Sequence, residues 1–73
     1  MHLLLSRDDS NWDLYDNGKY VQAIAKKGTW CSDSYFGGYD YFKKYIDCEI
    51  KSGKLKLEDL TDRGLEIYKK GGR

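Results

Sequence analysis

The sequence predicts an α+β fold, in which a three-stranded antiparallel β-meander over residues 2–27 precedes two amphipathic helices over residues 38–52 and 57–70. Three observations carry this prediction. An Asn-Gly pair separates two alternating segments, apolar residues recur at helical spacing between positions 35 and 50, and a second helical stripe begins near position 57. The 73 residues are expected to form a single small domain, 1–73, because the chain is too short for two separate cores.

The meander begins with the apolar residues Leu3–Leu5, which are followed by a turn-rich stretch of charged and polar residues. Asn17-Gly18 then favours a type I′ hairpin turn, whose two central residues both need positive φ angles. This turn pairs Asp16 with Lys19. The alternation then places one set of apolar residues on a common face: Trp12, Leu14, Val21 and Ala23.

The helix over residues 38–52 is predicted from apolar residues that recur at three- and four-residue steps: Tyr35, Tyr39, Phe42, Ile46 and Ile50. Residues 32–34, Ser-Asp-Ser, are all good N-cap residues. Because Gly37-Gly38 weakens a first turn, we expect the helix to begin at residue 38 or 39. Ser52-Gly53 ends it.

The helix over residues 57–70 carries acidic residues early and lysines late, the order that the helix dipole favours, and Gly71-Gly72 provides a stop. Gly64 lies in its apolar stripe at a cost of about 1 kcal/mol relative to Ala. We therefore expect a close approach there to the preceding helix or to the sheet. The expected core draws on all of these elements: Leu3 or Leu4, Leu5, Trp12, Leu14, Val21, Ala23, Phe42, Ile46, Ile50, Leu57, Leu60 and Ile67.

The composition argues against several classes of protein, namely strongly basic nucleic-acid binders, membrane-spanning proteins and secreted proteins. A net charge of +1 gives no general preference for nucleic acid, and 40% hydrophobic with 15% aromatic residues is typical of a folded soluble domain. No apolar run approaches the roughly 18 residues of a membrane span or the roughly 7–15 of a secretory signal. We expect a cytoplasmic protein with no membrane partner, in which Cys31 and Cys48 are free thiols.

The sequence offers little material for catalysis or metal binding. Cys31 precedes a predicted helix, where free amide groups favour a thiolate, but a Cys nucleophile needs a base. The single histidine, His2, lies far from it in sequence. His2, Cys31 and Cys48 also lack the close spacing of metal ligands, and no phosphate-binding glycine motif is present. We predict no enzymatic activity, no cofactor and no metal.

Aromatic residues are the most unusual feature, since two Trp, seven Tyr and two Phe occur among 73 residues. Protein interfaces are enriched in Trp and Tyr, which combine apolar area with a polar tip. Tyr41 and Tyr45 lie beside the core stripe of the first helix, within reach of Trp30 and Tyr35 near its start. We predict that these four residues form a docking patch. The alternative for each is a place in a small core.

Charge is unevenly distributed along the chain. Residues 1–16 hold one basic and four acidic groups, a net charge of −3, whereas residues 17–73 hold 12 basic and eight acidic groups, a net charge of +4. Lys43 and Lys44, on the outer face of the first helix, join the candidate binding residues. Such lysines can contact phosphates, or they can form a solvated surface with the interleaved acidic groups.

The segment 50–68 resembles the end of many bacterial winged-helix regulators. In that family a recognition helix and a glycine lead to a strand, and a Leu-Thr-x-x-Gly segment opens the last helix. The corresponding residues here are Leu60-Thr61-Asp62-Arg63-Gly64. The resemblance covers about a quarter of the chain and implies an alternative fold, a small winged-helix-like helix-turn-helix domain that binds DNA.

We expect a small non-enzymatic binding protein that acts through protein–protein contacts. Its partner would be another protein or a ribonucleoprotein complex, with nucleic acid as a second option, and a homodimer would add to a thin core. Compact, aromatic-rich chains without site chemistry are common among phage and mobile-element proteins that inhibit host machinery, including anti-CRISPR proteins. The alternative is a winged-helix-like DNA-binding regulator.

Overall fold

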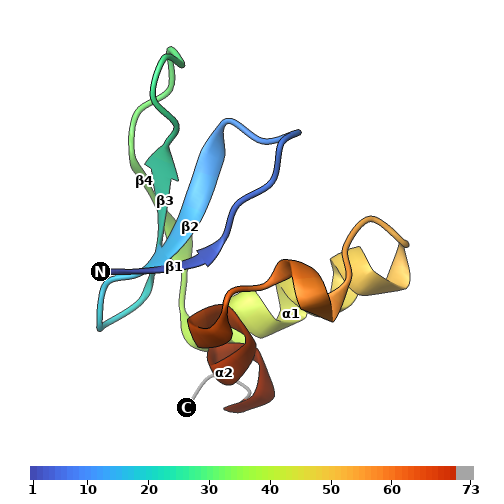
Figure 1. The fold of residues 1–73 in the computed structure, drawn as a ribbon. Helices are drawn as coiled ribbons and strands as arrows, with labels where there is room; N and C mark the ends of the chain where they lie inside the picture. Colours follow the sequence, from blue (N-terminus) through green and yellow to red (C-terminus); the bar gives the residue numbers. More distant parts are fainter. Residues whose placement is uncertain (71–73) are drawn as a thin grey trace.

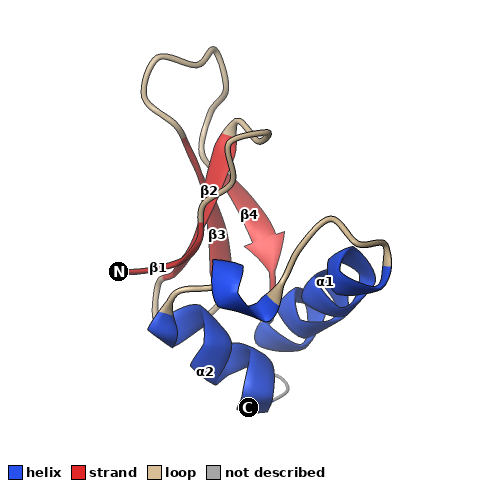
Figure 2. Ribbon diagram, turned by 45° about the vertical axis from the view of Figure 1, so that its right-hand side comes forward, coloured by secondary structure: helices blue, strands red, loops and turns tan. Residues whose placement is uncertain are grey.

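The computed structural model describes residues 1–70 and has an α+β architecture (Figure 1). Four antiparallel strands form one sheet in the order β1-β2-β3-β4. Two α-helices follow the sheet and lie together on one side of it (Figure 2). The elements have the following bounds: β1 His2–Leu5, β2 Trp12–Asp16, β3 Val21–Ala25, β4 Ser34–Gly37, α1 Tyr39–Lys51, a 3₁₀ helix Leu57–Asp59, and α2 Asp62–Lys70.

The fold class is as predicted, but the sheet has a fourth strand where the sequence predicted a helix cap. In β4, Ser34 pairs with Ala23 and Tyr35 pairs with Gln22. The carboxylate of Asp33 accepts a hydrogen bond from the Ala25 amide at 2.9 Å, so it supports the sheet. The helix itself begins at Tyr39, as expected.

The hairpin between β2 and β3 exists, but its predicted register is wrong by two residues. Asp16 pairs with Val21, so the connection has four residues and is not a two-residue type I′ turn. Gly18 has a φ of +94°, and within residues 1–70 only glycines have a positive φ. A shift of two residues preserves the sides of a strand, and Leu14, Val21 and Ala23 therefore still share one face.

A bulge at each edge of the sheet turns two consecutive residues toward the helices. The β1–β2 register slips between Leu3 and Leu5, and both Leu4 and Leu5 are buried. The β3–β4 register slips beside Phe36, which packs against the core. Each bulge thus adds an apolar residue to the core side of a short strand.

The core lies between the two helices and the face of the sheet that carries Leu14, Val21 and Ala23. It differs from the predicted core at four positions. Trp12 and Leu57 are exposed and Ile50 is only partly buried, whereas Leu55 is buried. The residues of the observed core are Leu4, Leu5, Leu14, Val21, Ala23, Phe42, Ile46, Leu55, Leu60 and Ile67.

The predicted helix 57–70 is divided because the chain leaves helical geometry to contact β1. Leu60 is extended, and the Thr61 amide donates to the Leu4 carbonyl at 3.1 Å. The Thr61 hydroxyl then accepts from the Gly64 amide at 3.1 Å, which caps α2. A Cβ on Gly64 would lie 2.3 Å from the Leu4 carbonyl oxygen, which confirms the expected close approach and assigns it to the sheet. The predicted stop at Gly71-Gly72 lies outside the described residues.

The winged-helix alternative is not the fold of residues 1–70. All four strands precede both α-helices, and the segment before α2 is a 3₁₀ helix where the winged-helix family has a strand. The Leu-Thr-x-x-Gly segment, Leu60–Gly64, instead attaches α2 to the end of β1. None of the helices in these residues combines the length and apolar character needed to cross a membrane.

Candidate protein-binding surface

The structure separates the four aromatic residues that the sequence placed in one patch. Tyr35 is exposed and contacts Tyr20, with ring centroids 4.9 Å apart. Its neighbour Phe36 packs instead against Tyr41 and Tyr45, with both centroid distances at 5.2 Å. Tyr35 and the tyrosines of α1 therefore do not form one continuous patch around Phe36, because consecutive strand residues point to opposite faces.

Trp30 lies on the β3–β4 loop, residues 26–33, and its side chain is fully exposed. This loop projects from the end of the sheet farthest from the helices (Figure 1). No aromatic contact in the described chain involves Trp30. The prediction that Trp30 is a surface residue is correct, but its proximity to Tyr41 and Tyr45 is not found.

Hydrogen bonds hold both ends of the Trp30 loop. At its start, the Lys26 amide donates to the Asn11 carbonyl at 2.9 Å, and Thr29 donates to the Lys26 carbonyl from its amide at 3.2 Å and its hydroxyl at 2.8 Å. At its end, the indole N–H of Trp12 donates to the Ser32 carbonyl at 2.9 Å. The loop is therefore an ordered support that presents one indole ring to solvent.

Tyr41 and Tyr45 differ in burial although they are one turn apart on α1. Tyr41 is half exposed and covers Gly37, whereas Tyr45 is partly buried against the core. The Tyr45 hydroxyl accepts a hydrogen bond from Arg7 Nη1 at 3.2 Å. Tyr41 thus fits the predicted surface role, and Tyr45 fits the alternative of a place at the core edge.

Lys43 and Lys44 have different surroundings, although both were predicted to lie on the outer face of this helix, α1. Lys43 Nζ lies 3.1 Å from Asp47 Oδ2 and 4.7 Å from the centroid of the Tyr68 ring. Two hydrogen bonds lower the pKa of Asp47 below its ordinary value. The bond from the Tyr68 hydroxyl has the larger effect and the bond from Lys43 the smaller. Lys43 therefore helps to attach α1 to α2, while Lys44 is exposed.

A hollow of about 120 Å³ lies on the core side of the sheet, beside α1. The sequence did not indicate it, because Trp12 was expected to fill the core at this place. Trp12 instead has 36% of its surface exposed. The residues that line the hollow are Leu5, Arg7, Ser10, Trp12, Leu14, Ala23, Phe36 and Tyr45.

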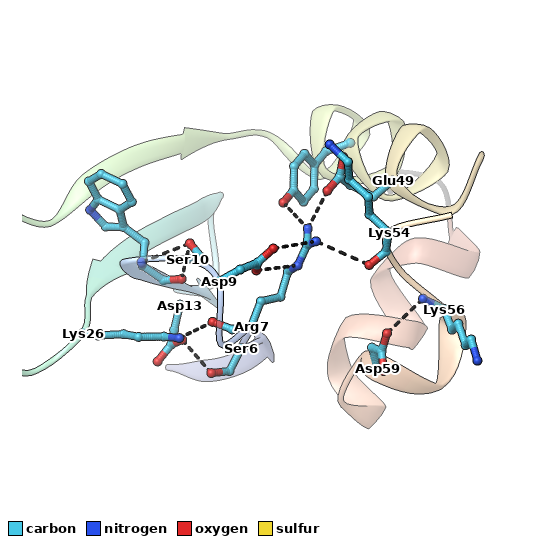
Figure 3. A network of polar contacts seen from close by, with 12 residues as sticks. Ser6, Arg7, Asp9, Ser10, Asp13, Lys26, Glu49, Lys54, Lys56 and Asp59 are labelled. Carbon is cyan, nitrogen blue, oxygen red and sulfur yellow. Dashed lines mark hydrogen bonds and ion pairs between the residues drawn. The ribbon is translucent and has the colours of Figure 1, made fainter. Parts of the chain in front are cut away.

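Arg7 closes one side of this hollow and links the β1–β2 loop to α1 (Figure 3). Its guanidinium contacts Glu49 at 2.5 Å and Asp9 at 3.3 Å, and it also donates to the Lys54 carbonyl at 3.4 Å. The bond to Glu49 is the main reason that the pKa of Arg7 is raised above its ordinary value. Arg7 is therefore a structural residue whose positive charge is already balanced by Glu49 and Asp9.

Cysteine, histidine and acidic side chains are the other groups that could carry site chemistry. Cys31 and Cys48 carry free thiols, and within residues 1–70 no three His, Cys, Asp or Glu side chains gather as a metal site would require. Comparisons with family models, curated proteins and solved structures find no match to this chain. The surface around Trp30 and the neighbouring hollow is thus the best-defined candidate site.

Proposed function

We propose that this protein is a non-enzymatic binding protein that uses Trp30 as its principal anchor to another protein. The supporting observation is a fully exposed indole on a loop that hydrogen bonds hold at both ends. Burial of a Trp side chain removes a large apolar area from water, and an ordered loop loses little conformational entropy on binding. Interface residues with these properties contribute a large share of binding energy.

The charge around the anchor favours a protein partner over a nucleic acid. Lys26, at the start of the Trp30 loop, lies 3.8 Å from Asp13 and also donates to the Arg7 carbonyl. The charge of Lys26 is therefore partly balanced, which leaves Lys27 as one exposed lysine on the loop, whereas a phosphate backbone is bound by clustered basic groups that release counterions. The partner is a protein, free or within a ribonucleoprotein complex.

In its most specific form, the proposal is that the protein inhibits host machinery by covering a surface, as phage and mobile-element inhibitors such as anti-CRISPR proteins do. One feature supports such a role, because the hydrogen-bonded loop gives a chain of 73 residues a preformed contact. This role requires affinity and geometry only.

The experiment compares Trp30→Ala with Lys27→Ala as immobilised baits in a bacterial host lysate. Both residues are exposed on the same loop, so neither substitution is expected to change stability by more than about 0.5 kcal/mol. We expect one protein or complex to be retained by the wild type and by Lys27→Ala and lost with Trp30→Ala.

Two results would contradict this proposal. The first is equal retention of the partner by both variants and the wild type. The second is binding to duplex DNA that depends steeply on salt concentration and is lost in Lys44→Ala. Such binding would assign the function to a basic surface. Sedimentation of the free protein should show whether the partner is a second copy of the chain.

A further inference from the structure

The hollow beside Trp12 has an apolar floor. Leu5, Leu14 and Ala23 form part of its lining, and each has less than a tenth of its surface exposed. Phe36 and Tyr45 add aromatic rings that meet edge to face, with centroids 5.2 Å apart. A group that enters the hollow therefore meets hydrocarbon below it and aromatic rings beside it.

The polar groups around the hollow already have partners. Arg7 donates to Tyr45, Glu49, Asp9 and the Lys54 carbonyl. The Ser10 hydroxyl bonds with the backbone of Trp12, and the Trp12 indole N–H donates to the Ser32 carbonyl. A charged or polar ligand would have to break these bonds, which costs free energy, whereas an apolar group would not.

The volume of the hollow fits one six-membered ring. It measures about 120 Å³, and a closed cavity of about 150 Å³ lined by Leu, Ile and Phe binds benzene. Aromatic walls also favour a ring over an aliphatic group, because edge-to-face pairs add attraction beyond buried area. We propose that this hollow binds one unsubstituted aromatic ring, presented as a phenylalanine side chain by the protein that Trp30 contacts.

The assignment of the ring to a partner rests on the proposed function. Trp12 connects the two sites, because it lines the hollow and its indole N–H bonds to Ser32, two residues after Trp30. A protein that buries Trp30 would therefore reach the rim of the hollow. The ring site itself depends only on the residues that line it.

Toluene, which is the phenylalanine side chain without its backbone, tests the ring site on the free protein. We expect intermolecular nuclear Overhauser effects (NOEs) from toluene to Leu14, Ala23 and Phe36 in the wild type. The expected dissociation constant is on the order of 1 mM, as suits a ligand of about seven heavy atoms. The polar ring of 4-methylimidazole should give none of these effects.

Ala23→Leu should fill the hollow and weaken toluene binding at least about tenfold. Ala25→Leu is the matched control, since Ala25 is on the same strand but does not line the hollow. The inference is overturned if toluene at saturation gives no NOEs to the lining residues, or gives them only to Tyr15 and Tyr35 on the other face. It is also overturned if a folded Ala23→Leu protein binds toluene like the wild type.

These results are separable from the test of Trp30. If Ala23→Leu does not fold, the map of NOEs on the wild type decides the question alone. Toluene binding in the hollow together with an undiminished partner affinity of Trp30→Ala would keep the ring site and contradict the proposed anchor. Absence of toluene binding in the hollow, together with a weakened partner affinity of Trp30→Ala, would overturn the ring site only.

Discussion

Asp16 is a buried carboxylate that joins three parts of the chain. It has 1% of its surface exposed and accepts hydrogen bonds from the Tyr39 hydroxyl at 2.6 Å, the Gly18 amide at 2.8 Å and Arg63 Nε at 2.9 Å. Burial alone raises the pKa of Asp16, but these three donors outweigh it and hold the pKa below its ordinary value. The charged form is thus the one that the fold stabilises.

Asp16→Asn is predicted to lower the free energy of unfolding by about 2 kcal/mol at pH 7, because it weakens the contacts with Arg63 and Tyr39. A lowered folded-state pKa gives stability that is present above the unfolded pKa of about 3.9 and is lost as pH falls through the folded-state pKa. Urea unfolding between pH 7 and about pH 2 should therefore show the two proteins converging in acid. A constant difference across this range would contradict the account.

Gly64 shows the same dependence on distant contacts for a residue without a side chain. In an isolated helix, Gly64→Ala would be favourable by about 1 kcal/mol. Here the new Cβ would lie 2.3 Å from the Leu4 carbonyl oxygen, so we predict a loss of about 2 kcal/mol or more. Gly38→Ala is the control, because it meets only the Asp40 carboxylate at 3.0 Å. Equal thermal midpoints for the two variants would contradict the close packing of α2 on β1.

At the scale of elements, the β2–β3 connection is stabilised by a side chain. Asn17 Oδ1 accepts from the amides of Lys19 and Tyr20, both at 3.0 Å, and Asn17 itself has no positive φ. The residue therefore acts through its oxygen, as in an Asx turn, and not through access to left-handed geometry.

Three substitutions at Asn17 distinguish the two kinds of turn. Asn17→Asp keeps the oxygen and should change stability by less than about 0.5 kcal/mol, whereas Asn17→Ala and Asn17→Gly should each cost about 1 kcal/mol. A type I′ turn would instead tolerate Asn17→Gly best. Thermal midpoints measured by circular dichroism rank the three variants. A thermal midpoint of Asn17→Gly at or above that of the wild type would contradict the Asx turn and support a two-residue type I′ turn.

At the scale of the whole molecule, the features predicted from sequence are those set by near neighbours. The hairpin and the start of α1 each depend on residues within a few positions. The glycine in the stripe of α2 predicted a close approach, but its partner Leu4 lies on β1, far away in sequence. The fourth strand was missed because residues 32–34 have the composition of a helix cap, while their actual partner is β3. Local pattern cannot distinguish these two uses of Ser and Asp.

The candidate site was predictable in part. The helical position of Tyr41 predicts its exposure, and Tyr41 is exposed. Trp30 is exposed as expected, but not at the expected place beside Tyr41 and Tyr45. The division of the aromatic group depends on β4, which turns Tyr35 and Phe36 to opposite faces. The hollow depends on Arg7, whose partner Glu49 lies 42 positions away in sequence. No spacing rule in the sequence brings these two residues together.

The central claim is that Trp30 anchors a protein partner, and the affinity of Trp30→Ala for the purified partner tests it most directly. Isothermal titration calorimetry should be run on the wild type, Trp30→Ala and Lys27→Ala under one salt condition. We predict that Trp30→Ala weakens binding about 30-fold, or about 2 kcal/mol, while all three proteins unfold at the same temperature. Dissociation constants for Trp30→Ala and the wild type that agree within about twofold would contradict the claim.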